Sequence, residues 1–129
     1  MKQSRGTRGG DERTIIPTTL DIAWAAGIYE GEGTATLHKV NGTAMVRVTQ
    51  AEPWLVLKLY DLFGGSMNTY AQRGIGTKPV CEWYISQARA RGFAMTIYKF
   101  LSPHKQKQLR TKILGNLQNE DIPFGKGAL

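Results

Sequence analysis

The sequence contains very little cysteine, no long apolar run and few acidic residues for its size. A single cysteine, Cys81, excludes an intrachain disulfide and a cysteine-rich zinc site. No apolar run approaches the roughly 20 residues that span a bilayer, and the N-terminus lacks the apolar segment of a signal peptide. We therefore expect no membrane partner and an intracellular protein that is not secreted, in the cytoplasm, the nucleoid or an organellar matrix.

The scarcity of acids leaves the chain basic. Lys and Arg total 17 against 10 Asp and Glu, which gives a formal net charge of +7. That balance suits a polyanionic partner such as nucleic acid, although a merely basic soluble protein has the same composition. With 129 residues, 41% of them hydrophobic, the chain supports one domain with a proper core. We expect a basic, flexible N-terminal arm (1–17), a single domain (18–118) and a C-terminal tail (119–129).

Hydrophobic periodicity alternates between helical and strand patterns along the domain. Thr18 or Thr19 is suited to cap a first helix, and Asn41-Gly42 is a strong hairpin signal. Gly64-Gly65 ends a second helix, which Pro53 begins. The order indicates an α+β fold with one antiparallel sheet covered on one face. We predict helices over about 19–32, 53–63, 89–101 and 103–118, and strands over 34–40, 44–49, 66–73 and 79–86.

The two faces of the predicted sheet differ in character. Residues expected to point into the core are apolar: Ala35, Leu37, Val46, Val48, Met67, Cys81, Trp83 and Ile85, packed under Leu55, Leu59, Leu62, Phe63, Phe93, Ile97, Phe100 and Leu101 of the helices. The opposite face is polar and partly basic, which fits either a solvated surface or a nucleic-acid interface. Its residues are Thr34, Thr36, His38, Met45, Arg47, Thr49, Asn68, Tyr70, Gln72, Glu82 and Tyr84, with Arg73 and Lys78 near a turn and placed for phosphates.

The first predicted helix has a stripe of very small side chains. Ala23, Ala26, Gly27, Glu30 and Gly31 fall at positions i, i+3, i+4, i+7 and i+8, so they share one face and allow another helix to approach closely. Glycine within a helix costs roughly 1 kcal/mol against alanine, so a packing gain must offset it. The acids at the end of this helix face the negative end of its dipole, an unfavourable position that a bound divalent cation would reverse.

Residues 25–33 resemble the signature of the LAGLIDADG homing endonucleases. Gly27 matches its first glycine, Glu30 its first acid, Glu32 its catalytic acid and Gly33 its closing glycine. Two later segments, Val48-Thr49-Gln50 and Lys105-Gln106-Lys107-Gln108, also occur in this family at about these distances. The resemblance covers roughly residues 20 to 118 and implies an αββαββα-type domain whose four-stranded sheet forms a saddle on double-stranded DNA.

The resemblance also implies chemistry. Glu32 and the backbone carbonyl near Gly31 are expected to bind Mg2+, for which Ca2+ or Mn2+ substitutes in vitro. Gln50 is expected to orient the attacking water, Lys105 to stabilise charge near the phosphate, and Lys107 to contact DNA. Family members more often carry Asp at the position of Glu32, and Glu is one methylene longer. The expected role of Glu30 is structural, through hydrogen bonds at the helix pair.

One copy of the signature supplies one catalytic carboxylate, so cutting both strands needs two chains. The sequence therefore predicts a homodimer through Ala23, Ala26, Gly27 and Glu30 that makes a double-strand break at a long pseudo-palindromic site, with no small-molecule substrate. In this family such activity serves intron or intein mobility. The alternative is a non-catalytic nucleic-acid binder on the same fold, either an intron maturase or a transcriptional regulator. A basic ribosome-associated or RNA-binding α+β protein is a third reading, which leaves the acids at the helix end unexplained.

Overall fold

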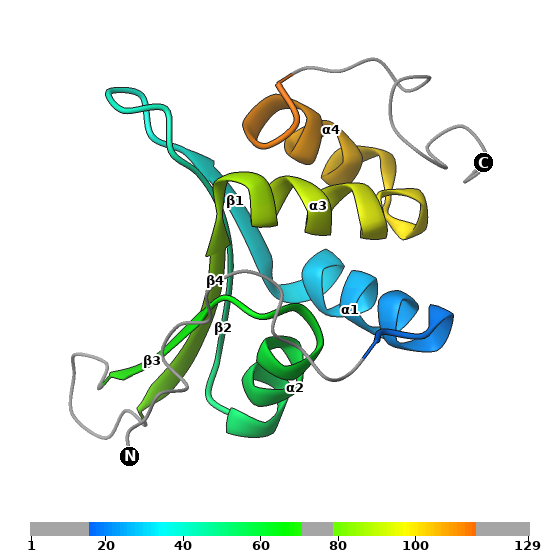
Figure 1. Cartoon of the computed structure of the whole chain (residues 1–129), viewed down its shortest axis with the longest axis vertical. Coiled ribbons are helices and arrows are strands. Elements are labelled where there is room, and N and C mark those ends of the chain that lie inside the picture. The colour runs from blue at the N-terminus through cyan, green and yellow to red at the C-terminus, as the bar shows by residue number, and fades with distance from the viewer. Residues whose placement is uncertain (1–15, 71–78, 116–129) are drawn as a thin grey trace.

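An antiparallel sheet of four strands carries the fold, and the helices lie on one of its faces (Figure 1). The strand order is β1-β2-β4-β3, so β2 and β4 meet at the centre. This confirms the α+β class and the sheet predicted from the sequence. The computed structural model describes residues 16–70 and 79–115. Its elements are α1 (Thr19–Glu32), β1 (Gly33–Leu37), β2 (Ala44–Gln50), α2 (Pro53–Phe63), β3 (Ser66–Tyr70), β4 (Val80–Ser86), α3 (Gln87–Ile97), the short 3-10 helix η1 (Tyr98–Phe100) and α4 (Pro103–Lys112).

Helix α1 begins at a capping box formed by Thr18, which is one of the two threonines predicted to cap the helix. Thr18 Oγ1 accepts a hydrogen bond from Asp21 N, and an oxygen of the Asp21 carboxylate accepts one from Thr18 N. The bond from the Thr18 backbone lowers the pKa of Asp21. These contacts satisfy two amide groups that would otherwise lack partners at the start of the helix. The cap fixes where α1 starts and hence which residues reach its far end.

The face that α1 buries differs from the predicted small-residue stripe. Ala26 is only 1% exposed and belongs to the chain's own core together with Ala25 and Tyr29, so its expected place at a dimer interface is wrong. Gly27 and Gly31 are exposed, and an added Cβ at either would meet nothing. Ala23 is half-buried beside them. The uncovered stripe of α1 therefore comprises Leu20, Gly27 and Gly31, bordered by the partly buried Ala23 and Trp24, and it is rotated away from the stripe expected from spacing alone.

The core between sheet and helices is built around Trp83 of β4. Its ring is fully buried, packs against Phe63 and Phe93, and donates a hydrogen bond from Nε1 to the Gly64 carbonyl at 2.7 Å. That carbonyl belongs to the turn that ends α2, where Gly64 and Gly65 both adopt positive φ. A side chain at Gly65 would overlap Ile85, so the glycine pair both reverses the chain and lets it approach β4.

Several predicted boundaries and core assignments need correction. β1 ends at Leu37 and α4 at Lys112, each earlier than expected, and the predicted end of β3 at residue 73 lies outside the described residues. Leu37 and Phe100 are exposed, so their predicted places in the core are wrong. Asn41-Gly42 does lie in the β1–β2 hairpin connection, with Gly42 at positive φ. Within the described ranges 16–70 and 79–115, no helix is long and apolar enough to cross a membrane.

Candidate functional site

Glu32 stands at the junction between α1 and β1, at one end of the sheet. It is the last residue of α1, and the chain enters β1 at the next residue without a loop. Its side chain is exposed, as is the neighbouring Gly31. The final carbonyl groups of a helix have no partner within the helix, so carboxylate and carbonyl oxygens are concentrated at this point. Oxygen ligands of this kind suit Mg2+ or Ca2+.

The junction is tight because Gly33 lies directly on the ring of Tyr29. Gly33 is buried, and a Cβ at this position would overlap atoms of that ring. Tyr29 is itself fully buried and donates a hydrogen bond from its hydroxyl to Gln108 of α4. Burial, and then the charge of Glu30, raise the pKa of Tyr29 above its usual range, so the hydroxyl remains a donor. The ring thus sets the direction in which the chain leaves α1.

Replacing Gly33 by alanine is expected to destabilise the fold by about 1–3 kcal/mol, because the added methyl group forces Tyr29 out of its packed position. Urea denaturation of the purified variant measures the change. Gly92→Ala is the matched control, since Gly92 lies within α3 and an added Cβ there meets nothing. The control should gain up to about 1 kcal/mol. Equal stability of the two variants would show that the Tyr29 ring moves aside freely.

Lys105 reaches the same junction from α4. Its Nζ donates a hydrogen bond to the Gly33 carbonyl at 3.0 Å and lies 5.1 Å from the centre of the Tyr29 ring. The ammonium group is therefore held beside the residue that follows Glu32. The structure brings together the two charged residues that the sequence predicted for the site.

Gln50 lies at the same end of the sheet. β1 pairs with β2 in a register that sets Gly33 opposite Val48, so Gln50, two residues further along β2, extends past the start of β1 towards the end of α1. Its side chain is partly exposed. Residues from α1, β2 and α4 therefore gather around one helix-to-strand junction.

Glu30 anchors this end of α1 to the start of α4. Its two carboxylate oxygens accept hydrogen bonds from Ser102 N at 2.9 Å and Ser102 Oγ at 2.7 Å. Burial raises the pKa of Glu30, but these bonds, with the charges of Lys105 and His104, bring it below its ordinary value. Glu30 is structural, as predicted, but its partners lie in its own chain rather than across a helix pair. Ser102-Pro103 has the pattern of a helix start, and Ser102 does cap α4, but the sequence did not predict the hydrogen bonds from Ser102 to Glu30.

Ser102→Ala is expected to lower stability by about 1–2 kcal/mol, because Ser102 also caps α4 by accepting from Lys105 N. Because the pKa of Glu30 is lower in the folded chain than its ordinary value of 4.5, ionised Glu30 stabilises the fold above pH 4.5. That stabilisation is lost as the pH falls through the pKa of the folded chain. The difference between wild type and variant should therefore shrink between about pH 7 and about pH 3 in urea titrations. Ser86→Ala is the control, because Ser86 precedes α3 without a side-chain cap bond. A stability difference between wild type and Ser102→Ala that does not change with pH would contradict the stabilising contact between Glu30 and Ser102.

The uncovered face of the sheet presents most of the predicted DNA-contacting residues. Arg47 on β2 lies between Thr34 on β1 and Tyr84 on β4, and Glu82 on β4 lies between Thr49 and Asn68. Thr36, Met45 and Tyr70 share this face. Arg47 Nε forms an ion pair with Glu82 Oε2 at 3.1 Å, an arrangement that sequence reasoning did not predict.

Two other predicted DNA-contacting residues, His38 and Lys107, lie away from the uncovered face. The ring of His38 is turned into the hairpin, where Nδ1 accepts hydrogen bonds from Val40 N and Asn41 N, both at 3.3 Å. Lys107 is exposed on α4, on the helix side of the sheet. Gln72, Arg73 and Lys78 lie outside the described residues.

A divalent cation fits the oxygen donors at the junction only if other ligands complete its shell. Glu32 supplies one exposed carboxylate, and the end of α1 supplies backbone carbonyls such as that of Gly31. In the part of the chain that the structure describes, no three His, Cys, Asp or Glu side chains gather as a metal site. Mg2+ normally keeps several waters and takes one or two carboxylates together with substrate phosphates. The donor set therefore suits a cation shared with a phosphate, and not one that the chain holds alone.

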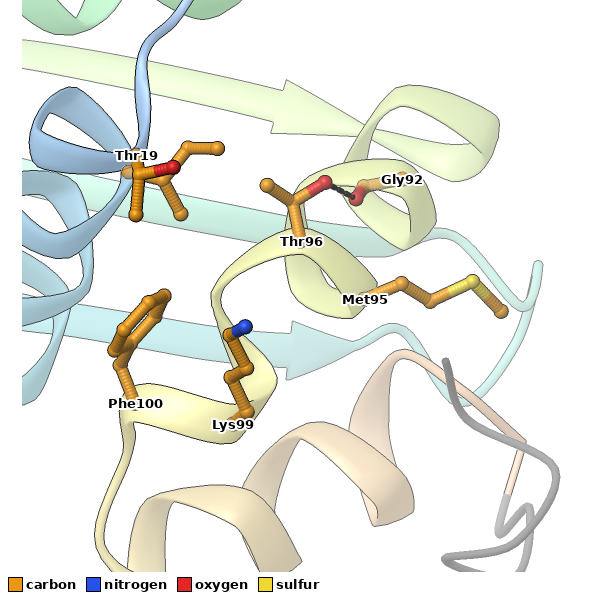
Figure 2. A pocket seen from close by; sticks show the side chains of 7 residues that line it. Thr19, Gly92, Met95, Thr96, Lys99 and Phe100 are labelled. Carbon is orange, nitrogen blue, oxygen red and sulfur yellow. Dashed lines mark hydrogen bonds between the residues drawn. The ribbon is translucent and has the colours of Figure 1, made fainter. Parts of the chain in front are cut away.

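A separate cavity of about 480 Å3 lies at the opposite end of α1, between its first turn and the second half of α3 (Figure 2). Most of the surface that lines it is apolar, and it includes none of Glu32, Gln50 or Lys105. The cavity is therefore distinct from the junction site.

Comparison with known proteins identifies the fold. No protein-family model and no curated protein sequence matches the chain. The structure is similar to that of the homing endonuclease I-CvuI in complex with its target in the presence of Ca, with a TM-score of 0.55, 18% identity, and 84% of this chain and 75% of that chain covered. A second structure, I-CvuI with the I-CreI target and Mg, in which the DNA is not cleaved, gives a TM-score of 0.50 and 15% identity over the same shares. The chain therefore has the fold of the LAGLIDADG homing endonucleases, the family whose signature residues 25–33 resemble.

Proposed function

We propose that the protein is a site-specific DNA endonuclease that works as a homodimer, requires Mg2+ and breaks both strands of a long pseudo-palindromic site. The observation that carries the proposal is the contact of Lys105 with the Gly33 carbonyl, next to Glu32, at the end of the sheet where the register also sets Gln50. The helices leave the other face of that sheet uncovered (Figure 1). Glu32, Gln50 and Lys105 are the three residues to which the family resemblance assigns the chemistry. A carboxylate, an amide and an ammonium group around one point match the needs of phosphodiester hydrolysis.

DNA is the partner that best fits the uncovered face. The similar I-CvuI structures are complexes with DNA targets. The net charge of +7 favours a polyanion, since binding releases counterions from the phosphates. Curved antiparallel strands fit the major groove, where alternate side chains reach base edges. Arg47, Asn68 and Thr34 have the donors and acceptors that such contacts use.

Two observations support a dimer. Each chain offers one Glu32, and two strand breaks call for two catalytic carboxylates. The exposed stripe of α1 includes Gly27 and Gly31, where a neighbouring helix can approach the backbone closely, and Leu20, which is 82% exposed. A two-fold axis along this stripe would bring the two Glu32 residues to the same place, because each lies at the end of its helix.

Each residue of the junction has a role that its chemistry permits. Glu32 and the Gly31 carbonyl would hold a divalent cation, which when bound supplies positive charge that neutralises the phosphate. The side-chain amide of Gln50 orients a water for attack on phosphorus. Lys105, held by the Gly33 carbonyl, stabilises the charge that develops as the bond to the departing sugar oxygen breaks. The water oxygen bonds to phosphorus as the bond to the sugar oxygen breaks; the water loses one proton to solvent and the departing sugar oxygen takes one up from solvent, so atoms and charge balance.

Selection from a randomised duplex library tests the proposal. The purified chain is incubated with the library in Mg2+, with Ca2+ as a parallel binding-only condition, and cleaved and bound molecules are sequenced. We expect cleaved molecules with 3′ overhangs that share a pseudo-palindromic sequence. Enrichment of bound but never cleaved sequences would favour the non-catalytic binder, an intron maturase or a transcriptional regulator. A ladder of random nicks would contradict the proposal.

A further inference from the structure

Glu82 is an unusual residue for a surface that meets DNA. It lies on the uncovered face of the sheet, between Thr49 of β2 and Asn68 of β3, and yet its side chain is only 11% exposed. A carboxylate on this face repels phosphates and lowers non-specific affinity. Burying it also costs free energy unless it is paired. Its presence here calls for a function that outweighs both costs.

The partner of Glu82 is a residue suited to reading bases. Glu82 and Arg47 lie diagonally across β2 and β4, and Arg47 Nε is 3.1 Å from Glu82 Oε2. Arg47 Nη2 also donates to Met45 Sδ at 3.0 Å. The Arg47 side chain remains 45% exposed. Arg47 is thus held by Glu82 and Met45 and is still accessible to a ligand.

These contacts prepare the guanidinium group for one kind of ligand. With Nε paired to Glu82 and Nη2 donating to Met45 Sδ, the second N–H of Nη2 and the N–H groups of Nη1 are left for a bidentate contact, and among the described residues Nη1 has no partner. A pair of parallel N–H donors matches O6 and N7 of guanine, the commonest specific contact of arginine in the major groove. Fixing the side chain before binding reduces the ordering cost that a long flexible residue otherwise incurs.

From this geometry we infer that Arg47 and Glu82 act as one unit that recognises guanine at a defined position in each half of the DNA site. Arg47 makes the base contact, and Glu82 is a positioning residue that holds the guanidinium in place. The inference rests on the proposed function, because it requires that the uncovered face meets DNA. It adds the identity of a base and the side chains that select it.

The test compares base preferences among variants in the Ca2+ binding selection. Wild type is expected to select guanine at one position per half-site, about tenfold or more over other bases. Glu82→Gln should reduce that preference severalfold at the same position and leave the others unchanged. Arg47→Lys should abolish it, because lysine lacks the planar pair of donors. Glu52→Gln removes the same charge from an exposed residue without a side-chain cap bond, and should match wild type.

Circular dichroism gives the folded fraction of each variant, so that a loss of base preference can be told apart from a loss of folding. If Glu82→Gln folds poorly, Arg47→Lys still tests the base contact, because it keeps the positive charge. In the double variant Arg47→Lys with Glu82→Gln, base preference should equal that of Arg47→Lys alone, since Glu82 acts only through Arg47. The inference would be overturned, with the proposed function intact, if Glu82→Gln had the same base preferences as wild type. The same would follow if the position that depends on Arg47 selected a base other than guanine. A wild-type chain that selects no sequence would instead overturn the proposed function.

Discussion

Glu32→Gln is expected to bind DNA as wild type does and to cut it more than about a hundredfold more slowly. The substitution keeps the size of the side chain but removes the carboxylate charge at the end of α1, where a divalent cation would bind. Binding should persist, because Glu32 lies beyond the strands and the uncovered face retains its contacts. Electrophoretic binding in Ca2+ and cleavage rates in Mg2+ on the same selected duplex measure the two effects separately.

The conservative variant Glu32→Asp sharpens this prediction. Aspartate is the commoner residue at this position in the family that the chain resembles, so cutting should be retained. The exposed position of Glu32 leaves room for either acid without a change in packing. Cutting by Glu32→Gln at a rate close to that of wild type would remove Glu32 from the chemistry, whatever Glu32→Asp does.

Gly27→Leu is expected to convert a dimer into a monomer and to abolish double-strand cutting. An added side chain at Gly27 meets nothing within its own chain, so a lone subunit should tolerate leucine and gain up to about 1 kcal/mol of helix stability. In a dimer packed through α1, the two leucines would occupy the space in which the helices meet. Light scattering at the working concentration gives the mass, and cleavage of the selected duplex gives the activity.

Gly92→Leu is the control for this substitution. Gly92 is also an exposed glycine within a helix, with open space around it, but it lies on α3 and not on the uncovered stripe of α1. It should change neither the mass of the particle nor the cutting rate. A monomeric wild type, or a Gly27→Leu variant that remains dimeric and active, would show that α1 is not the interface.

The local structure of the chain follows from short-range signals. Thr18 and Asp21 specify the start of α1, and Asn41-Gly42 specifies the first hairpin, because capping and turn preferences depend on a few adjacent residues. Alternation of apolar and polar residues identified the buried face of β2 and β4, including Val46 and Trp83. The family resemblance named Glu32, Gln50 and Lys105; in the fold, Lys105 contacts the carbonyl of the residue after Glu32, and Gln50 lies at the same end of the sheet.

Longer-range features could not be predicted from the chain alone. Spacing shows which residues of α1 share a face but not which face meets the core, so Ala26 was placed outside when it lies inside. The ion pair of Arg47 and Glu82 depends on β2 pairing with β4, a neighbour relation between strands that are not consecutive. The contact between Glu30 and Ser102 joins residues 72 positions apart. Each of these three features depends on how helices and strands pack together, and the local pattern of residues does not specify that packing.

Mapping the ends of a cleaved duplex tests the central claim most directly. The selected site, labelled on both strands, is incubated with the purified chain in Mg2+, and the break positions are read at single-nucleotide resolution. Two junction sites related by a two-fold axis should break both strands at positions symmetric about the centre of the site, and no breaks should occur in Ca2+. DNA that is bound at its selected site in Mg2+ yet stays intact on both strands would contradict the assignment of an endonuclease.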